Sequence, residues 1–565
     1  MTLVNIERLT EEQQYLVVQS MTMMDSYYDA EMQLLKDEEQ PDRHDTRGSA
    51  HYALGLLIRR GPGDLERACG LIAKVIDLQF DYPSEIYHGT FRTSPTAATP
   101  PVGNYDWKSF APGFAYFLND TMEKIGQRLT NRLSRAEHPA ISGLDPKTIK
   151  QSLQDAIDEV LPPVWRSYDP NWREFIACAF AMILDHFAEI LPHELVMRMD
   201  ESMDKAVGAS IDRRLSDAVP MNSNIELMHI FIAHYYGHRL GNAAWIQHAD
   251  REAVSFQAAF AEFGSFAEFN TTTYYGVDLT VLGMWRSYGR SPEFVKIGAE
   301  LEQGLWVNIA LFYNPNLENL SGPFSRAYEM EMRGHSSIGV FLYLALGKGY
   351  EYLAGLNCES SHDPLIALVG VDVPEALRPL LVAHREDRRI EKQFRELCER
   401  DKPGQNRNLC TAAAWIEQDL MIGAMSGSRN TNGQMHSGTI HWKAQDGEKY
   451  YLRLIRREVG KGWNTHLRGI NFEARVAKDL LAVDVSLNTE LEIEIYFEIR
   501  GANISAGSFT PDIWNMPGLT LKVEVSAPEP SIIQKEGFVE VVYLYRPQNI
   551  SPDMSFTLRV APAPL

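Results

Sequence analysis

Apolar residues recur at helical spacing along most of the chain. In segments 51–60 and 64–80 the period is about 3.6 residues, and Gly61, Pro62 and Gly63 separate the two segments. Glycine and proline end helices, so this pattern predicts a helical hairpin whose second helix is capped by Asp64. Further pairs are predicted at 172–191 with 194–218, at 223–239 with 244–263 and at 274–288 with 291–313. Residues 1–425 are therefore expected to be helices joined by short loops.

Recurring helical pairs build either an open solenoid or a closed toroid. The predicted pairs share no consensus sequence, and the loops between them, such as 82–107, are rich in aromatic and polar residues. Loops of that kind, gathered at one end of a ring, suit a cleft. The sequence favours an (α/α) toroid of helical hairpins, and a solenoid that only binds partners stays open as the alternative.

From about residue 430 the hydrophobic period changes to two. Segments 439–444, 490–500 and 519–527 alternate apolar with polar residues, and turn-forming Gly, Pro and Asn separate them. This alternation predicts an antiparallel β-sandwich. We therefore expect a toroid domain at 1–425 and a sandwich domain at 426–565. The link between the two halves is expected at 423–438, whose Gly, Ser and Asn content suits an exposed loop that can reach back over the helical cleft.

Composition and charge argue against several classes of function. The net charge is −21, with 75 acidic against 54 basic residues, whereas nucleic-acid binding requires a basic surface. No apolar run is long enough for a membrane span. The acidic start lacks the pattern of a signal peptide, so a cytoplasmic location is expected. The five cysteines are scattered without a CxxC pair, which favours free thiols over disulfides or metal ligands.

Polar residues concentrate between 222 and 288. The segment 269–279, FNTTTYYGVDL, predicts an extended turn followed by a helix that begins at Tyr274. A phenol at a helix mouth can act as a general acid or base when nearby cations lower its pKa, and Asn270 can bind a carboxylate or hydroxyl. The alternative is an ordinary helix start with a packed tyrosine.

Histidines on the preceding predicted helix are candidate bases. His234 and His238 share one face, and His229 points away from it. The H-x3-H spacing is compatible with zinc, but no third ligand is evident, so neither a metal nor a cofactor is predicted. Core histidines are the alternative. Asn224 lies at the start of this helix, where a cap is also expected.

Arg326 is the candidate for binding a substrate carboxylate, because a planar guanidinium fits that geometry. A salt bridge with Glu329 or Glu331 is the alternative. Other polar and aromatic side chains in these segments are candidate substrate-binding residues, namely Tyr328, Tyr105, Trp107, Tyr236, His238, Arg239, Tyr275 and His335. For hydrolysis by two carboxylates, Glu268 with Asp278 is the most suggestive pair.

The helical half, the sandwich and the segment NTTTYYGVDL some 50 residues after Asn224 together resemble the heparinase II/III-like and alginate-lyase-like polysaccharide lyases. The resemblance implies β-elimination at a uronic acid in a carbohydrate substrate. Asn224 or Asn270 would then bind the carboxylate with Arg326. His229 or His234 would remove the C5 proton, and Tyr274 would protonate the leaving oxygen. Related lyases often carry His directly after the Asn, where this chain has Ile225.

Two other functions remain open from the sequence. One is a glycoside hydrolase on the same toroid, and the other is a protein that binds carbohydrate without catalysis. Neither nucleic acid nor membrane is an expected partner, and homo-oligomerisation stays open.

Overall fold

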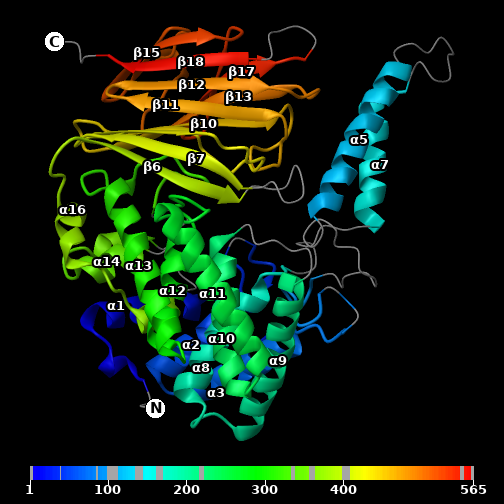
Figure 1. The fold of residues 1–565 in the computed structure, drawn as a ribbon, viewed down its shortest axis with the longest axis vertical. Coiled ribbons are helices and arrows are strands. Elements are labelled where there is room, and N and C mark those ends of the chain that lie inside the picture. Colours follow the sequence, from blue (N-terminus) through cyan, green and yellow to red (C-terminus); the bar gives the residue numbers. More distant parts are fainter. Residues whose placement is uncertain are drawn as a thin grey trace.

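The computed structural model describes residues 4–38, 40–83, 85, 87–97, 112–133, 144–160, 169–215, 222–332, 338–355, 363–397, 407–547 and 553–561. Helices fill the first part of the chain and a stack of strands fills the last, with the two parts in contact (Figure 1). The predicted order, helical hairpins followed by an antiparallel β-sandwich, is confirmed.

Helical hairpins pack into a ring. The hairpins are α2 (Thr46–Arg59) with α3 (Asp64–Asp77), α8 (Trp172–Phe187) with α9 (His193–Leu215), α10 (Ser223–Leu240) with α11 (Ala243–Phe263), and α12 (Tyr275–Tyr288) with α13 (Pro292–Phe312). The first helices of these pairs contact one another in chain order, α2 to α8, α8 to α10 and α10 to α12. Helix α15 (Asp363–Val369) packs on both α12 and α2 and so closes the ring.

Other helices surround this ring or stand beside it. They are α1 (Glu11–Tyr27), α5 (Pro112–Leu133), α7 (Pro146–Val160), α14 (Ile338–Leu346) and α16 (Arg378–Val382). Helices α5 and α7 form a hairpin that projects beside the sandwich (Figure 1). Helix α1 begins with a capping box, in which Thr10 and Gln13 each accept a backbone N–H of the other. Among the described helices, none combines the length and the apolar character needed to cross a membrane.

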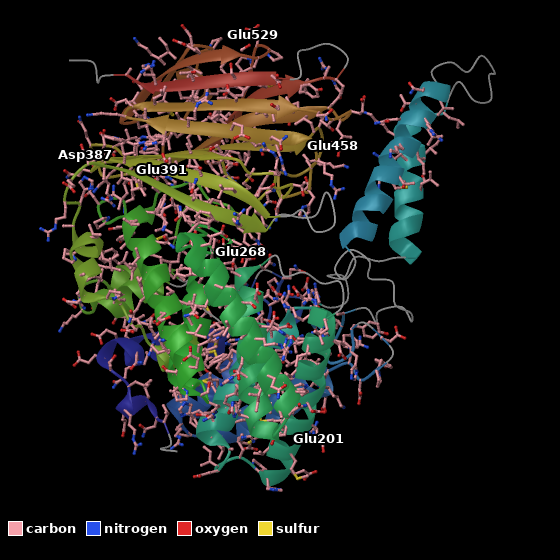
Figure 2. The ribbon with its side chains drawn as sticks, in the orientation of Figure 1. Glu201, Glu268, Asp387, Glu391, Glu458 and Glu529 are labelled. Carbon is pink, nitrogen blue, oxygen red and sulfur yellow. The ribbon has the colours of Figure 1, made fainter. Side chains whose placement is uncertain are left out.

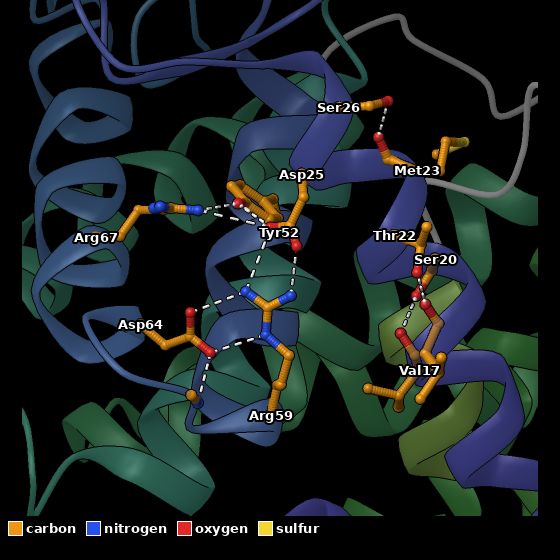
Figure 3. Close-up of polar contacts among 12 residues, drawn as sticks. Val17, Ser20, Thr22, Met23, Asp25, Ser26, Tyr52, Arg59, Asp64 and Arg67 are labelled. Carbon is orange, nitrogen blue, oxygen red and sulfur yellow. Dashed lines mark hydrogen bonds and ion pairs between the residues drawn. The ribbon is translucent and has the colours of Figure 1, made fainter.

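The turn between α2 and α3 differs in detail from the prediction. Gly63, with a φ of 80°, is the N-cap, and Asp64 is the first helical residue. The Asp64 carboxylate accepts from the Gly61 N–H at 2.7 Å and from the Arg59 guanidinium at 2.8 Å. Arg59 also donates to Asp25 of α1, so these charged groups tie three helices together (Figure 3).

Replacing Asp64 by alanine is expected to lower the free energy of unfolding by about 1–3 kcal/mol, because a buried Arg59 contact and the Gly61 N–H lose their acceptor. Asp77→Ala on the same helix is the matched control, since its ion pair with Arg198 is exposed and is expected to cost less than about 1 kcal/mol. Urea unfolding of both variants measures the difference. Equal losses would contradict a structural role for Asp64.

The sandwich contains two antiparallel sheets. The larger has the strand order β16-β17-β13-β10-β9-β8-β7-β6, and the smaller has the order β11-β12-β18-β15-β14. The aromatic rings of Phe497, Trp514, Tyr543 and Phe556 meet between the sheets. The strands of the larger sheet are β6 (Arg388–Leu397), β7 (Arg407–Ile416), β8 (Leu420–Ser426), β9 (Gly438–Lys443), β10 (Lys449–Glu458), β13 (Ile493–Arg500), β16 (Ser531–Lys535) and β17 (Phe538–Tyr545). Those of the smaller sheet are β11 (Ile470–Ala477), β12 (Leu480–Leu487), β14 (Ile513–Met516), β15 (Leu519–Ser526) and β18 (Asp553–Val560).

The prediction of helices up to residue 425 is wrong from residue 388 onward, where β6, β7 and β8 lie. Strand β6 carries charged residues on its exposed positions, and β7 contains three consecutive alanines, which favour helices. Their pairing along the full length of both strands overrides that preference. The division into two domains at 425 and 426 remains a prediction.

A short segment within the helical part contacts both halves of the molecule. It follows the hairpin of β4 (Tyr313–Asn314) and β5 (Asn319–Leu320) and runs to residue 332. On one side it contacts the turn before α12, where Thr272 donates to the Glu329 carbonyl. On the other it pairs with the 423–438 connection, in which His436 and Phe324 exchange backbone hydrogen bonds. The segment 423–438 is therefore not an exposed link between the halves, because it contains the end of β8 and the connection to β9, and most of its residues are buried. It does reach back to the helical half, as the sequence suggested.

Candidate active site

A cavity of about 370 Å³ opens beside this junction segment. It lies at the N-terminal ends of α2, α8, α10 and α12, and the end of α1 with the small sheet β1 (Tyr28–Asp29), β2 (Leu34–Lys36) and β3 (His44–Asp45) completes its wall. Helix N-termini carry partial positive charge and favour anions. The described residues that line it include Tyr27, Lys36, Asp37, Glu38, Asp45, Arg47, Asp169, Asn171, Trp172, Phe175, Asn222, Asn224, Ile225, Tyr274, Val277, Arg326 and Tyr328.

Tyr274 stands at the centre of a hydrogen-bonded group on the cavity wall. Its hydroxyl donates to the Tyr328 hydroxyl at 2.9 Å and accepts from Arg326 Nη2 at 3.0 Å. The Arg326 guanidinium also lies over the Tyr274 ring, 4.1 Å from its centroid. Burial raises the pKa of the Tyr274 phenol, and the positive charge of Arg326 opposes that rise. The lowered pKa expected from the sequence is therefore not found, and the phenol is protonated at neutral pH with a cation beside it.

Arg326 is held in turn by two other side chains. Its Nη1 donates to Glu268 Oε1 at 2.5 Å, and its Nε donates to Gln434 Oε1 at 2.8 Å. The sequence suggested Glu329 or Glu331 as the structural partner, but the ion pair is with Glu268, which lies at the junction of the two halves (Figure 2). Arg326 thus orients Tyr274 as well as facing the cavity.

Asn222 and Asn224 bring amides into the cavity from the start of α10. Asn222 is the N-cap residue, yet its side chain makes no capping hydrogen bond. The Asn224 side chain is buried, and its Oδ1 has no partner among the described residues. An amide N–H beside helix N-termini can donate to an oxygen of a ligand, and an amide oxygen such as Asn224 Oδ1 can accept from a ligand hydroxyl.

Asn270 and Tyr275, by contrast, lie behind the cavity wall. Asn270 has a φ of 53° and donates through Nδ2 to the carbonyls of Ser321 and Pro323. Its backbone N–H donates to the Tyr275 hydroxyl at 2.6 Å. Asn270 thereby anchors the junction segment on which Arg326 and Tyr328 stand.

The predicted carboxylate pair is also behind the wall. Glu268 is occupied by Arg326. Asp278 is fully buried, and neither of its oxygens has a hydrogen-bond partner among the described residues. Burial raises the pKa of Asp278, the negative charge of Glu268 adds to the rise, and Arg326 opposes it. Asp278 is therefore a neutral acid inside the helical ring.

No histidine is among the described residues that line the cavity. His229 contacts Ser210 through Nδ1 and His248 through Nε2, both at 2.8 Å. His234 stacks on Phe294 with 3.8 Å between ring centroids, and its Nε2 accepts from the Arg290 N–H. His238 packs edge-on against His234. These rings occupy the interior and outer side of the helical ring.

Acidification is expected to destabilise the fold through these histidines. Burial lowers the pKa of His234 to about 3 and also lowers that of His229. The unfolded chain binds protons below a pH of about 6.5 while native His234 stays neutral, so stability falls as the pH drops below about 6.5 and continues to fall toward 3. At pH 5 this contribution of His234 amounts to about 2 kcal/mol.

Urea unfolding at pH 7 and pH 5 measures that effect. His234→Gln is expected to lose less free energy of unfolding between the two pH values than the wild type, by about 2 kcal/mol. The exposed His193 at the start of α9 provides the control His193→Gln, with the wild-type dependence expected. An unchanged pH dependence in His234→Gln would overturn the assignment.

Two other predicted substrate-binding residues make structural contacts, and three fall outside the described residues. Tyr236 donates to the Ala177 carbonyl, and Arg239 pairs with Asp200 on the outer side of the helices. Tyr105, Trp107 and His335 fall outside the described residues. Cys69, Cys178 and Cys410 are free thiols. Within the described ranges, no group of three or more His, Cys, Asp or Glu residues is arranged to hold a metal ion.

The sequence missed the opposite wall of the cavity. The Arg47 guanidinium lies 5.7 Å from the centre of the Trp172 ring and 4.9 Å from that of Phe175. Burial raises the pKa of Asp45 and of Asp169, and the charge of Arg47 opposes both rises. Asp45 and Asp169 precede α2 and α8, and Arg47, Trp172 and Phe175 lie at the starts of these helices. Asn222 and Tyr274 likewise precede α10 and α12. The polar residues at the starts of α2, α8, α10 and α12 were the feature of the sequence that could have identified this wall.

Fold and cavity together define a class: a closed ring of helical hairpins joined to a β-sandwich, with a polar site at the helix N-termini beside the junction. Residues 14–143 and 147–368 match the family described as a domain of unknown function, DUF8769, and the chain belongs to that family. No curated protein matches the sequence.

Solved structures that match over nearly the whole chain include a heparinase III and a chondroitin AC lyase. The Heparinase III-BT4657 gene product has 10% identity and a TM-score of 0.33, and the match covers 99% of this chain and 85% of that one. The chondroitin AC lyase of Streptomyces coelicolor A3 has 9% identity and a TM-score of 0.32, covering 97% and 96%.

Proposed function

We propose that the protein is a lyase that cleaves uronic-acid-containing oligosaccharides by β-elimination, with Tyr274 as the proton donor to the leaving oxygen. The observation that carries this proposal is the Tyr274 phenol, facing a cavity of about 370 Å³ and held by Arg326 and Tyr328. A cavity of this size is in the range of small-ligand sites. The phenol stays protonated at neutral pH, so it can donate its proton to a strongly basic leaving oxygen.

The helix N-termini around the cavity support an anionic substrate. Four helix N-termini and the amides of Asn222 and Asn224 surround the cavity, and these groups stabilise negative charge. When the C5 proton leaves a uronate, the electron pair is delocalised onto the carboxylate, where these donors would hold it. The electron pair then forms the C4–C5 double bond, the C4–O bond breaks, and Tyr274 supplies the proton to the departing oxygen.

The base is proposed to be a cavity carboxylate rather than His229 or His234. Asp45 and Asp169 line the same cavity as Tyr274, and burial raises the pKa of each carboxyl above its ordinary value. A carboxylate with a raised pKa is a stronger base than an exposed one. Asp45→Asn and Asp169→Asn would separate the two candidates by the loss of rate.

Hydrolysis by Asp45 and Asp169 is the second candidate, because two carboxyls with raised pKa values share one cavity. The Glu268 and Asp278 pair is not supported for this role, since Arg326 occupies Glu268 and Asp278 lies behind the wall. The two reactions give different products.

The test is incubation with a panel of uronate-containing oligosaccharides, followed by ultraviolet absorbance for the unsaturated uronate and by a reducing-end assay. Elimination produces both signals. New reducing ends without absorbance would reject the lyase and favour hydrolysis. Binding without either signal would reject both reactions in favour of a carbohydrate-binding protein.

A further inference from the structure

Gln434 links the β half of the molecule to the candidate acid. It lies on the connection between β8 and β9, far along the chain from Tyr274, and its side chain is 7% exposed. Its Oε1 accepts from Arg326 Nε at 2.8 Å, and its backbone carbonyl accepts from the Ala327 N–H at 2.8 Å. One residue thus fixes both the guanidinium and the backbone next to it.

The surroundings of Gln434 hold it in place. Its backbone N–H donates to Asn432 Oδ1 at 2.9 Å. Two residues further on, His436 donates through Nε2 to the Ala327 carbonyl at 2.9 Å and exchanges backbone hydrogen bonds with Phe324. The acceptor that Arg326 meets is therefore part of an ordered strand-like pairing, and its position is set before a ligand arrives.

We infer that Gln434 is a positioning residue for the proposed elimination: it orients the Arg326 guanidinium so that Nη2 meets the Tyr274 hydroxyl. The inference rests on the proposed function for its catalytic consequence. It also makes the β half part of the site, because the Gln434 side chain that accepts from Arg326 lies on the connection between β8 and β9.

The geometry of a guanidinium explains the effect. Arg326 is planar, and its Nε, Nη1 and Nη2 point in different directions to Gln434, Glu268 and Tyr274. Three partners fix the rotation of the plane. Without the Nε acceptor, the guanidinium can turn toward the charged Glu268, which is the stronger partner, and the Tyr274 contact is lost.

The amide of Gln434 also suits the task because it is neutral. It accepts a hydrogen bond without adding negative charge, so the Arg326 charge stays available to the phenol. A glutamate at this position would keep the acceptor oxygen and add a second carboxylate next to Arg326. That carboxylate would raise the pKa of Tyr274 further.

Two variants test the inference. Gln434→Leu is expected to lower kcat by roughly ten- to a hundredfold with little change in KM, because the proton donor is misplaced. Gln434→Glu retains an acceptor for Arg326 Nε and is expected to keep more of kcat than Gln434→Leu does. Wild-type kcat in Gln434→Leu, or an equal loss of kcat in both variants, would overturn the inference. The matched control is Gln257→Leu, which removes a glutamine side chain that bridges α11 and α13 at the surface.

A second measurement does not depend on turnover. A fluorotyrosine incorporated at position 274 reports its own environment by fluorine NMR. Its signal and its pH response are expected to change in Gln434→Leu and to stay unchanged in Gln257→Leu. If no uronate substrate is cleaved by the wild type, the proposed function fails, and the fluorine signal still decides whether Gln434 acts on Tyr274. An identical signal in the wild type and Gln434→Leu would overturn the coupling.

Discussion

Tyr274→Phe is expected to lower kcat for elimination by about 10²- to 10⁴-fold, the range typical of a lost general acid. The variant keeps the ring beneath Arg326 and removes only the hydroxyl that contacts Arg326 and Tyr328. KM is expected to change little, because the phenol matters most when the C4–O bond breaks. The measurement is the rate of unsaturated-uronate formation at saturating substrate.

The neighbouring tyrosine provides the control. Tyr275 is buried, lies behind the cavity wall and accepts the Asn270 N–H. Tyr275→Phe is expected to lower the free energy of unfolding by about 1–3 kcal/mol, since that N–H loses its acceptor. Its kcat per folded molecule is expected to remain near the wild-type value. Equal loss of kcat in both variants would show that Tyr274 acts only through the local structure.

Arg326→Met is expected to lower the free energy of unfolding by about 3–5 kcal/mol and to remove activity, because Glu268 is left as a buried charge without its partner. The double variant Arg326→Met with Glu268→Gln is expected to recover most of the stability and none of the activity. Urea unfolding and the uronate assay measure the two effects separately. Recovery of activity in the double variant would contradict a direct action of Arg326 on Tyr274.

Much of the fold could be predicted from hydrophobic periods. The hairpins around α2, α8, α10 and α12 and most sandwich strands follow from a change of period along the chain. Strands β6 and β7 could not be predicted in this way, because charged residues and alanines resemble a helix until a partner strand is known.

The candidate site, like the fold, was predicted only in part from the sequence. Tyr274, Arg326, Tyr328 and Asn224 line one cavity, and each had been singled out beside a predicted helix start or an extended loop. His229 and His234 could not be oriented, because α10 is buried on nearly every face and has no polar stripe to mark its outer side. Asp45 and Asp169 join the site only through ring closure, which no local pattern reveals.

The first residue along the chain that lines the cavity is Met23, and one of the two side chains that hold Arg326 is Gln434. A chain that stops anywhere before the β8–β9 connection can therefore form helical hairpins and still lack an assembled site. Contacts between such distant positions form late, because long loops must close first. During synthesis the contact between Arg326 and Gln434 can form only after residue 434 has left the ribosome, so the candidate site is assembled late.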